Sequence, residues 1–309
     1  MKRSPYAQAA LLTLALAACG ESKESTQDAV DAAVVERVEP DAGPYFEGER
    51  YVVAGTHVNV IRKMSFTGLI EPGVALGFNL DDRVSPLGER ESCGHGDLVD
   101  PEGNEGIDNQ LAKVWEMIKP IVGPQVDALL QGAINEGRVL IMVELEGVDD
   151  LKNDDDVTVN VFRGALDPDV GTFGFIAPDQ TFDYDYSNPI STAKGAKIEN
   201  GRVIAGPVTL QIPIAILDLN TVAQVHFGRI QLDIADDGTF KGFIGGALNV
   251  PEIVGELLMT GAAAETMLVK PFFENNADMV KVDGDCTYIS IGVNIEGTTA
   301  FVLRDAAME

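Results

Sequence analysis

The residues best suited to chemistry lie between positions 93 and 109, where oxygen-bearing side chains recur at short intervals among glycines. This spacing suits Ca²⁺, which takes six to eight oxygen ligands and needs a backbone that can wrap around the ion. The pattern is not an EF-hand, because a loop that starts at Asp100 has Glu105 where glycine is required and Leu111 at its twelfth position. The sequence therefore predicts either a Ca²⁺ loop of another kind or an acidic surface loop in which Asp108 caps the following helix. The four predicted Ca²⁺ ligands are Asp97, Asp100, Asn104 and Asp108.

A second acidic segment, residues 149–156, carries five aspartates between two predicted strands. Such a cluster can hold a cation, but a run of like charges is also the usual composition of a solvated loop. Both interpretations stay open, and the solvated loop is the simpler of the two.

Residues 181–186 alternate strictly, which places Phe182, Tyr184 and Tyr186 on one face of a predicted strand. Asp183 and Asp185 then lie on the opposite face. An exposed aromatic row can stack on sugar rings, so these three aromatic residues are the predicted ligand-binding residues. The alternative is that the row packs in the core while the two acids face water.

Signatures of known enzyme classes are absent from the sequence. It contains no GxSxG nucleophile motif, no HExxH zinc motif, no Walker-type phosphate loop and no dinucleotide fingerprint after a strand. A pair of carboxylates acting on a glycosidic bond stays open. Because acids are so common in this chain, no particular pair stands out as catalytic.

The N-terminus has the order of a secretion signal. Lys2 and Arg3 precede an apolar run at positions 9–18, which is long enough for a secretory signal and too short for a permanent membrane span. The run ends in Leu-Ala-Ala-Cys at positions 16–19, which is similar to the lipobox of bacterial lipoproteins. The resemblance implies cleavage of residues 1–18 and lipidation of Cys19, including a palmitate chain. Gly20 in place of aspartate implies sorting to the outer membrane of a Gram-negative cell.

Lipidation would make the membrane a partner of this protein through its acyl chains, since each buried CH₂ contributes about 0.8 kcal/mol. Residues 19–45 are polar and charged, without a sustained apolar period, which predicts a disordered tether. No composition break divides residues 46–309, so we expect one globular domain there.

Two cysteines remain after lipidation, Cys93 and Cys286. In an exported protein a single remaining pair most simply forms a disulfide, with two free thiols as the alternative. Closing so long a loop would remove about 5 kcal/mol of freedom from the unfolded chain.

The charge balance limits the class of partner. The chain has 49 acidic and 22 basic residues, a formal net charge of −27, and loss of Lys2 and Arg3 with the signal takes it to −29. Such a surface repels phosphates, which excludes nucleic acid as a partner. Cations, basic proteins and neutral glycans remain compatible with it.

Strand patterns dominate the second half of the chain. Apolar residues alternate along 208–216, where Pro213 indicates an edge strand or a bulge, and along 230–234. Asn200-Gly201 and the turn at 236–238 predict hairpins. Further strands are expected at 51–60, 139–145, 157–162, 287–295 and 299–303. The fold class is therefore mainly β, a β-sandwich with two or three helical insertions, with an open β-barrel as the alternative.

The helical insertions follow from the 3.6-residue period. One helix is expected to start at Asp108 and end at Pro120, and a second to start near Pro124 and stop at Gly137. A third is expected from Pro251 toward Met267.

Several segments together resemble a group of uncharacterised lipoproteins of the myxobacterial type. The main one is the Cys-Gly, Asp and Gly-Ile-Asp-Asn pattern across 93–111, and others lie at 148–159, 180–183, 238–246 and 285–292. The likeness spans about residues 90 to 300. It implies an outer-membrane lipoprotein and carries no assigned activity.

Three functions are compatible with these observations. The first is a non-catalytic binding or structural domain in the bacterial envelope, with a glycan or protein partner and Ca²⁺ as a structural ion. The second is a polysaccharide hydrolase that uses paired carboxylates. The third is a lipid carrier or envelope-assembly factor with an apolar interior.

Overall fold

The computed structural model describes residues 45–47, 50–52, 56–90, 93–216, 219–259 and 263–305. All of them fall in one unit, Pro40–Glu309. The predicted signal, the lipidation site Cys19 and residues 19–44 of the predicted tether lie outside the described residues. Within the described ranges, no helix is both long and apolar enough to cross a membrane.

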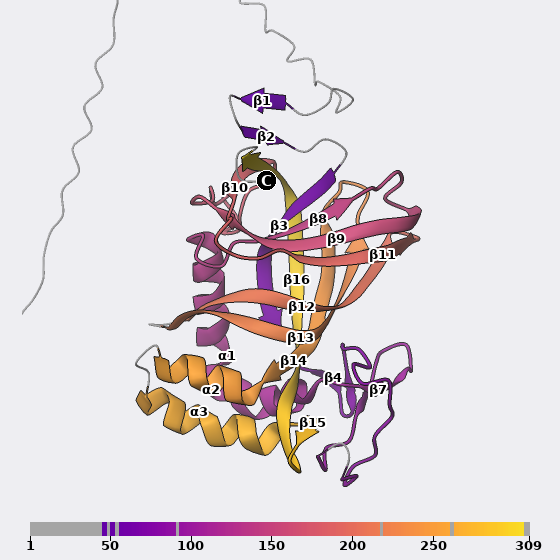
Figure 1. The fold of residues 1–309 in the computed structure, drawn as a ribbon, viewed down its shortest axis with the longest axis vertical. Helices are drawn as coiled ribbons and strands as arrows, with labels where there is room; N and C mark the ends of the chain where they lie inside the picture. The colour runs from indigo at the N-terminus through magenta and orange to yellow at the C-terminus, as the bar shows by residue number, and fades with distance from the viewer. Residues whose placement is uncertain are drawn as a thin grey trace, which may run out of the picture. The chain divides into compact units, whose positions relative to one another are not determined.

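A large, almost entirely antiparallel sheet organises the fold, which confirms the mainly β class with helical insertions. Eight of its strands pair in the order β3-β8-β9-β11-β12-β13-β14-β16, and β16 also pairs with β3, so that these strands form a closed ring. In Figure 1, β9, β11, β12 and β13 run across the view while β3 and β16 run nearly vertically. The ring strands are β3 (Thr56–Phe66), β8 (Ile141–Glu146), β9 (Asn153–Ala165), β11 (Ser191–Glu199), β12 (Arg202–Ile216), β13 (Leu219–Ile234), β14 (Phe240–Asn249) and β16 (Asp285–Asp305).

Further strands extend this sheet at the ends of β16. Strand β10 (Gln180–Tyr184) pairs in parallel with β16 and antiparallel with β9, and β15 (Met279–Val282) pairs with β16. Strand β2 (Arg50–Val52) joins β16 to β1 (Tyr45–Glu47). A smaller second sheet consists of β4 (Leu69–Glu71), β5 (Val74–Ala75), β6 (Leu98–Val99) and β7 (Glu105–Ile107).

Along each strand of the ring, side chains alternate between the inner and the outer face. Paired residues on neighbouring strands share a face, and in one such row Val203, Leu232 and Ile295 are fully buried. Such rows turn into the ring and fill it with side chains, as an eight-stranded closed sheet requires. Their neighbours one position along each strand, such as Arg202 and Asp233, point outward.

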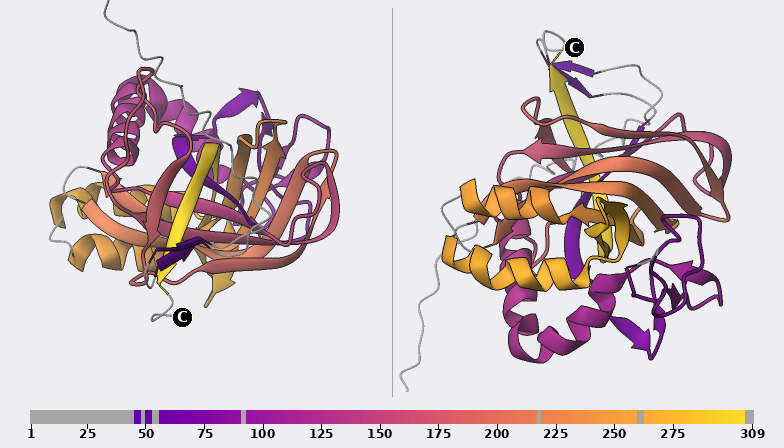
Figure 2. Two further views of the ribbon diagram at one scale, coloured as in Figure 1. Left: turned by 90° about the horizontal axis from the view of Figure 1, so that it is seen from above. Right: turned by 60° about the horizontal axis from the view of Figure 1, so that its bottom comes forward.

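Helix α1 (Gln110–Asn135) differs from the prediction in two ways. It begins after Asn109, whose Oδ1 accepts a hydrogen bond from the Ala112 amide at 3.1 Å, so Asp108 is not the cap. It also runs through Pro120 without ending, and its axis bends in Figure 2, as expected of a helix with internal prolines. Packing at both ends of the helix outweighs the stability that proline costs a helix interior. The ring centroids of Trp115 and Phe66 lie 5.2 Å apart, and the C-terminal turns pack into the core.

The third predicted helix is two helices, α2 (Val250–Met259) and α3 (Ala263–Asn276). They contact each other and lie side by side in Figure 2. Both hairpin predictions are confirmed: Asn200 and Gly201 connect β11 to β12 with positive φ angles, and the turn at 236–238 connects β13 to β14. Pro213 lies where β12 pairs with β13 alone, which is the edge position expected of it.

The predicted disulfide is present. Cys93 and Cys286 are bonded, with their Cα atoms 6.0 Å apart and 193 positions between them in sequence. The bond fastens the long segment between β5 and β6 to β16.

Candidate ligand-binding groove

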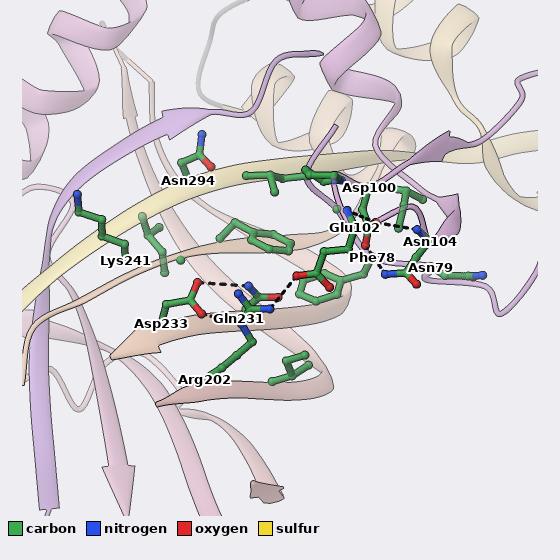
Figure 3. A pocket seen from close by; sticks show the side chains of 18 of the residues that line it. Phe78, Asn79, Asp100, Glu102, Asn104, Arg202, Gln231, Asp233, Lys241 and Asn294 are labelled. Carbon is green, nitrogen blue, oxygen red and sulfur yellow. Dashed lines mark hydrogen bonds and ion pairs between the residues drawn. The ribbon is translucent and has the colours of Figure 1, made fainter. Parts of the chain in front are cut away.

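A groove of about 710 Å³ lies on the outer face of the ring (Figure 3). Its floor consists of outward side chains from five adjacent strands, β12, β13, β14, β16 and β3. Its wall consists of residues 76–79, which follow β5 of the small sheet, and residues 100–107, which follow β6 and include β7. The volume is within the range of small-ligand sites, and apolar atoms supply most of the lining surface although most of the lining residues are polar or charged.

Strand register aligns the floor residues into two rows. One row alternates in charge across all five strands, and the other is uncharged. Residues in each row are direct cross-strand partners, so their side chains are neighbours. The charged row is Arg202, Asp233, Lys241, Glu296 and Lys63, and the uncharged row is Ile204, Gln231, Phe243, Asn294 and Ser65.

Ion pairs neutralise most of the charged row. Arg202 Nε donates to Asp233 at 2.6 Å, and Lys63 Nζ donates to Glu296 at 3.1 Å. Arg202 also reaches across the groove to Glu102 of the wall at 3.0 Å (Figure 3). Hydrogen bonds to Asp233 and Glu102 raise the pKa of Arg202. Lys241, in contrast, forms no ion pair within the described part of the chain.

Two glycines allow the wall to approach the sheet. Gly245 and Gly292 are direct partners on β14 and β16, and each lies two residues along its strand from the uncharged row of the floor. A Cβ on Gly245 would lie 2.7 Å from the Phe78 ring, and one on Gly292 would lie 2.5 Å from the Asn109 amide. The space they leave lets Phe78 stack on Phe243, with ring centroids 4.7 Å apart. The wall is therefore packed directly onto the floor.

Behind the wall, at the first turn of α1, lies a polar cluster that we call the helix-start cluster. The Gln110 amide donates to Ser290 Oγ at 2.7 Å, and the Ser290 amide donates to Asp278 at 2.8 Å. The Leu80 amide donates to Asp108 at 2.6 Å, which ties the wall segment to the cluster. The members are His95, Asp97, Asp108, Gln110, Lys113, Asp278 and Ser290.

Burial controls the charges of this cluster. Burial raises the pKa of Asp108 to about 8 and that of Asp278 to about 6. It lowers the pKa of Lys113, although the surrounding carboxylates oppose that shift. His95 has a lowered pKa through burial and the nearby Lys113, and its Nδ1 lies 2.9 Å from Gln110 Nε2. A neutral imidazole that accepts this hydrogen bond fits both observations.

The four predicted Ca²⁺ ligands have separate local partners. Asp97 accepts from the Ser85 amide at 2.6 Å, and Asp108 accepts from the Leu80 amide. Asp100 accepts from the amides of Glu102 and Asn104 and from the Asn104 side chain, which closes a tight turn. Across the described ranges, no group of three or more His, Cys, Asp or Glu side chains could hold a metal ion.

The acidic segment at 149–156 forms a turn and the start of β9, and Asp154 accepts hydrogen bonds from the amides of Asp149 and Asp156. In the aromatic row, Phe182 is 1% exposed and belongs to the core. Tyr184 and Tyr186 are half-buried, and their ring centroids lie 4.6 Å apart. The Arg304 guanidinium lies 5.2 Å from the Tyr184 ring centroid. The row therefore packs largely against the protein's own residues.

Sequence motifs do not indicate the groove, because its residues come from strands that are distant in sequence. The polar alternation in β13 and β14 indicates outward side chains, but only the register shows which of them align. Comparison with protein-family models, with curated proteins and with solved structures finds no match for this chain, so the resemblance to myxobacterial-type lipoproteins stays a prediction.

Proposed function

We propose that this protein is an exported lipoprotein, held on the outer membrane of a Gram-negative cell by lipid on Cys19, whose β domain binds an envelope ligand in the groove without catalysis. The anchor is supported by the N-terminal sequence: a basic start, a short apolar run and the Leu-Ala-Ala-Cys sequence at positions 16–19.

The observation that carries the binding role is the preformed groove. Its wall is fixed to the floor by the Phe78–Phe243 stack, and the exposed Glu102–Arg202 ion pair crosses from wall to floor. The disulfide at Cys93 and the helix-start cluster hold the segment that carries the wall from behind. A site whose shape exists before the ligand arrives loses less entropy on binding.

The chemistry of the groove favours binding over hydrolysis. A general acid needs a carboxyl of raised pKa that faces the substrate. The carboxyls with a raised pKa, Asp97, Asp108 and Asp278, belong to the helix-start cluster rather than to the groove lining. The floor carboxylates Asp233 and Glu296 are engaged in ion pairs. The charged row across the floor also suits a polar ligand better than an acyl chain.

The anchor is tested by replacing Cys19 with alanine. We expect the full-length wild-type protein to incorporate an alkyne-labelled palmitate and to fractionate with the outer membrane. The Cys19→Ala variant should lose both properties. Equal labelling of the two proteins would rule out Cys19 as the lipidation site.

The groove is tested by lysine acetylation followed by mass spectrometry. Lys241 lines the groove and Lys194 is exposed outside it, so the two serve as probe and internal control. An envelope extract from the cells that produce the protein should slow acetylation of Lys241 by at least threefold while leaving Lys194 unchanged. Equal rates with and without extract would contradict ligand binding in the groove.

A further inference from the structure

The central strands of the groove floor have no free backbone edge. Strands β13, β14 and β16 are each paired on both sides where they cross the groove. A peptide that adds to a sheet needs unpaired N–H and C=O groups on an edge strand. Recognition on these central strands must therefore come from side chains.

Apart from Lys241, those side chains carry little uncompensated charge. The carboxylates of Asp233 and Glu296 are paired with Arg202 and Lys63. The formal net charge of −27 also opposes the approach of polyanions. The groove is consequently suited to a ligand without net charge.

The uncharged row has unused hydrogen-bonding capacity. Within the described part of the chain, the side chains of Asn294 and Ser65 make no hydrogen bond, and Gln231 makes one long contact of 3.4 Å to Asp233. Amides and hydroxyls offer donors as well as acceptors, which is what a ligand dense in hydroxyl groups requires. Ile204, which is 52% exposed, stands in the same row as an apolar contact, while Phe243 is buried beneath Phe78.

The row is also long. It crosses four strand-to-strand steps of about 4.8 Å each, roughly 19 Å in total. An extended ligand of several units matches this length better than a single small molecule.

We propose that the groove binds a neutral, hydroxyl-rich oligosaccharide chain, whose hydroxyl groups exchange hydrogen bonds with Gln231, Asn294 and Ser65. This inference rests on the proposed function and adds the class of ligand. The amides fix the sugar ring by donating and accepting at once, and the exposed Ile204 contacts an apolar face of the ring.

The acetylation experiment separates the two claims when the envelope extract is treated beforehand. One portion is digested with protease, and a second is oxidised with periodate, which cleaves neighbouring diols, and then quenched. The proposal predicts that protection of Lys241 survives protease digestion and disappears after periodate oxidation. Protection that is lost to protease and resistant to periodate would overturn the oligosaccharide while leaving a groove ligand in place. If even the untreated extract gives no protection, both claims fail.

A variant pair tests the residues. Gln231→Ala combined with Asn294→Ala should raise the extract concentration needed for half-maximal protection at least tenfold. Gln224→Ala serves as the matched control, because Gln224 is exposed on the same strand β13 outside the groove. The circular dichroism and thermal midpoint of each variant establish that it is folded. An unchanged concentration dependence in the folded double variant would overturn the assignment of these side chains.

Discussion

The groove and the helix-start cluster contain the same kinds of residue, carboxylates, a lysine and side-chain amides, yet they put them to opposite uses. In the groove the charges face water, and the side chains of Arg202 and Glu102 are 42% and 64% exposed. In the helix-start cluster Asp108 and Gln110 are each 4% exposed and Ser290 is fully buried. The pairing partners are side chains in the groove and mainly backbone amides in the cluster.

Burial, more than residue type, decides what a polar group contributes to stability. An exposed ion pair contributes about 0–1 kcal/mol because water and salt screen it. A buried group that loses its hydrogen-bond partner costs about 1–3 kcal/mol. The helix-start cluster should therefore control stability, and the groove should be free to vary for binding.

The largest effect is expected at the disulfide that fastens the segment between the two regions. Replacing Cys93 and Cys286 with alanine should lower the free energy of unfolding by roughly 4 kcal/mol, because the unfolded chain regains the freedom of a long closed loop. Urea denaturation of the oxidised wild type and of the double variant measures this difference. Reduced wild type is the control and should match the variant. A loss below about 1 kcal/mol would mean that the cluster holds the segment without the bond.

Local patterns predicted those parts of the fold that depend on neighbouring residues. The hairpin at Asn200-Gly201 was predicted correctly, because asparagine and glycine readily adopt the two positive φ angles that this turn requires. Pro120 gave a wrong helix end, because the packing of both halves of α1 outweighs a local preference. Asp108 was expected to cap that helix, but tertiary contacts with Leu80 bury it and leave the cap to Asn109.

The groove lay beyond prediction for a physical reason. Arg202 and Lys63 reach one row only through three intervening strands, and bulges shift the register on the way, for example between Glu296 and Gly297. A one-residue slip would turn the whole row inward. Sequence alternation shows which residues of a strand share a face, but the alignment of five strands is a property of the assembled sheet.

The next largest effect on stability is expected from substituting a buried asparagine, compared with an exposed one. Asn109 is 1% exposed; it caps α1 and donates to Thr67 at 2.6 Å and to the Leu76 carbonyl at 2.8 Å. Asn109→Ala should cost about 3 kcal/mol, because a helix cap is lost and two buried acceptors lose their donor. Asn104→Ala, at an exposed position in the groove wall, should cost less than about 0.5 kcal/mol. Thermal and urea unfolding compare the two, and similar losses would remove the distinction between the regions.

A third prediction uses pH. Asp108 has a pKa of about 8 in the folded protein, well above its ordinary value, so the folded state holds a proton that the unfolded state has lost. Stability from this group is complete below about pH 4 and falls as the pH rises toward 8. Asp278, with a pKa of about 6, adds to the fall in the lower part of that window. Urea midpoints measured from pH 5 to pH 8 should therefore decrease in the wild type.

The neutral isostere Asp108→Asn should flatten this decrease, because the amide does not titrate. Asp154→Asn is the contrasting control. Hydrogen bonds from the amides of Asp149 and Asp156 lower the pKa of Asp154, so its stability contribution is lost only as the pH falls below its ordinary value. An Asp108→Asn variant that keeps the full wild-type slope above pH 5 would show that other groups produce it.

The smallest effect is expected where the wall meets the floor. Glu102→Gln keeps the shape of the side chain and removes the charge that faces Arg202, and we expect a loss below about 0.5 kcal/mol because both groups are largely exposed. Raising the salt concentration to 1 M should abolish even this difference. A double-mutant cycle with Arg202→Gln measures the coupling directly. A coupling above about 1.5 kcal/mol would place this ion pair with the buried contacts, and the groove wall would then belong to the stabilising framework rather than to a surface free to vary with its ligand.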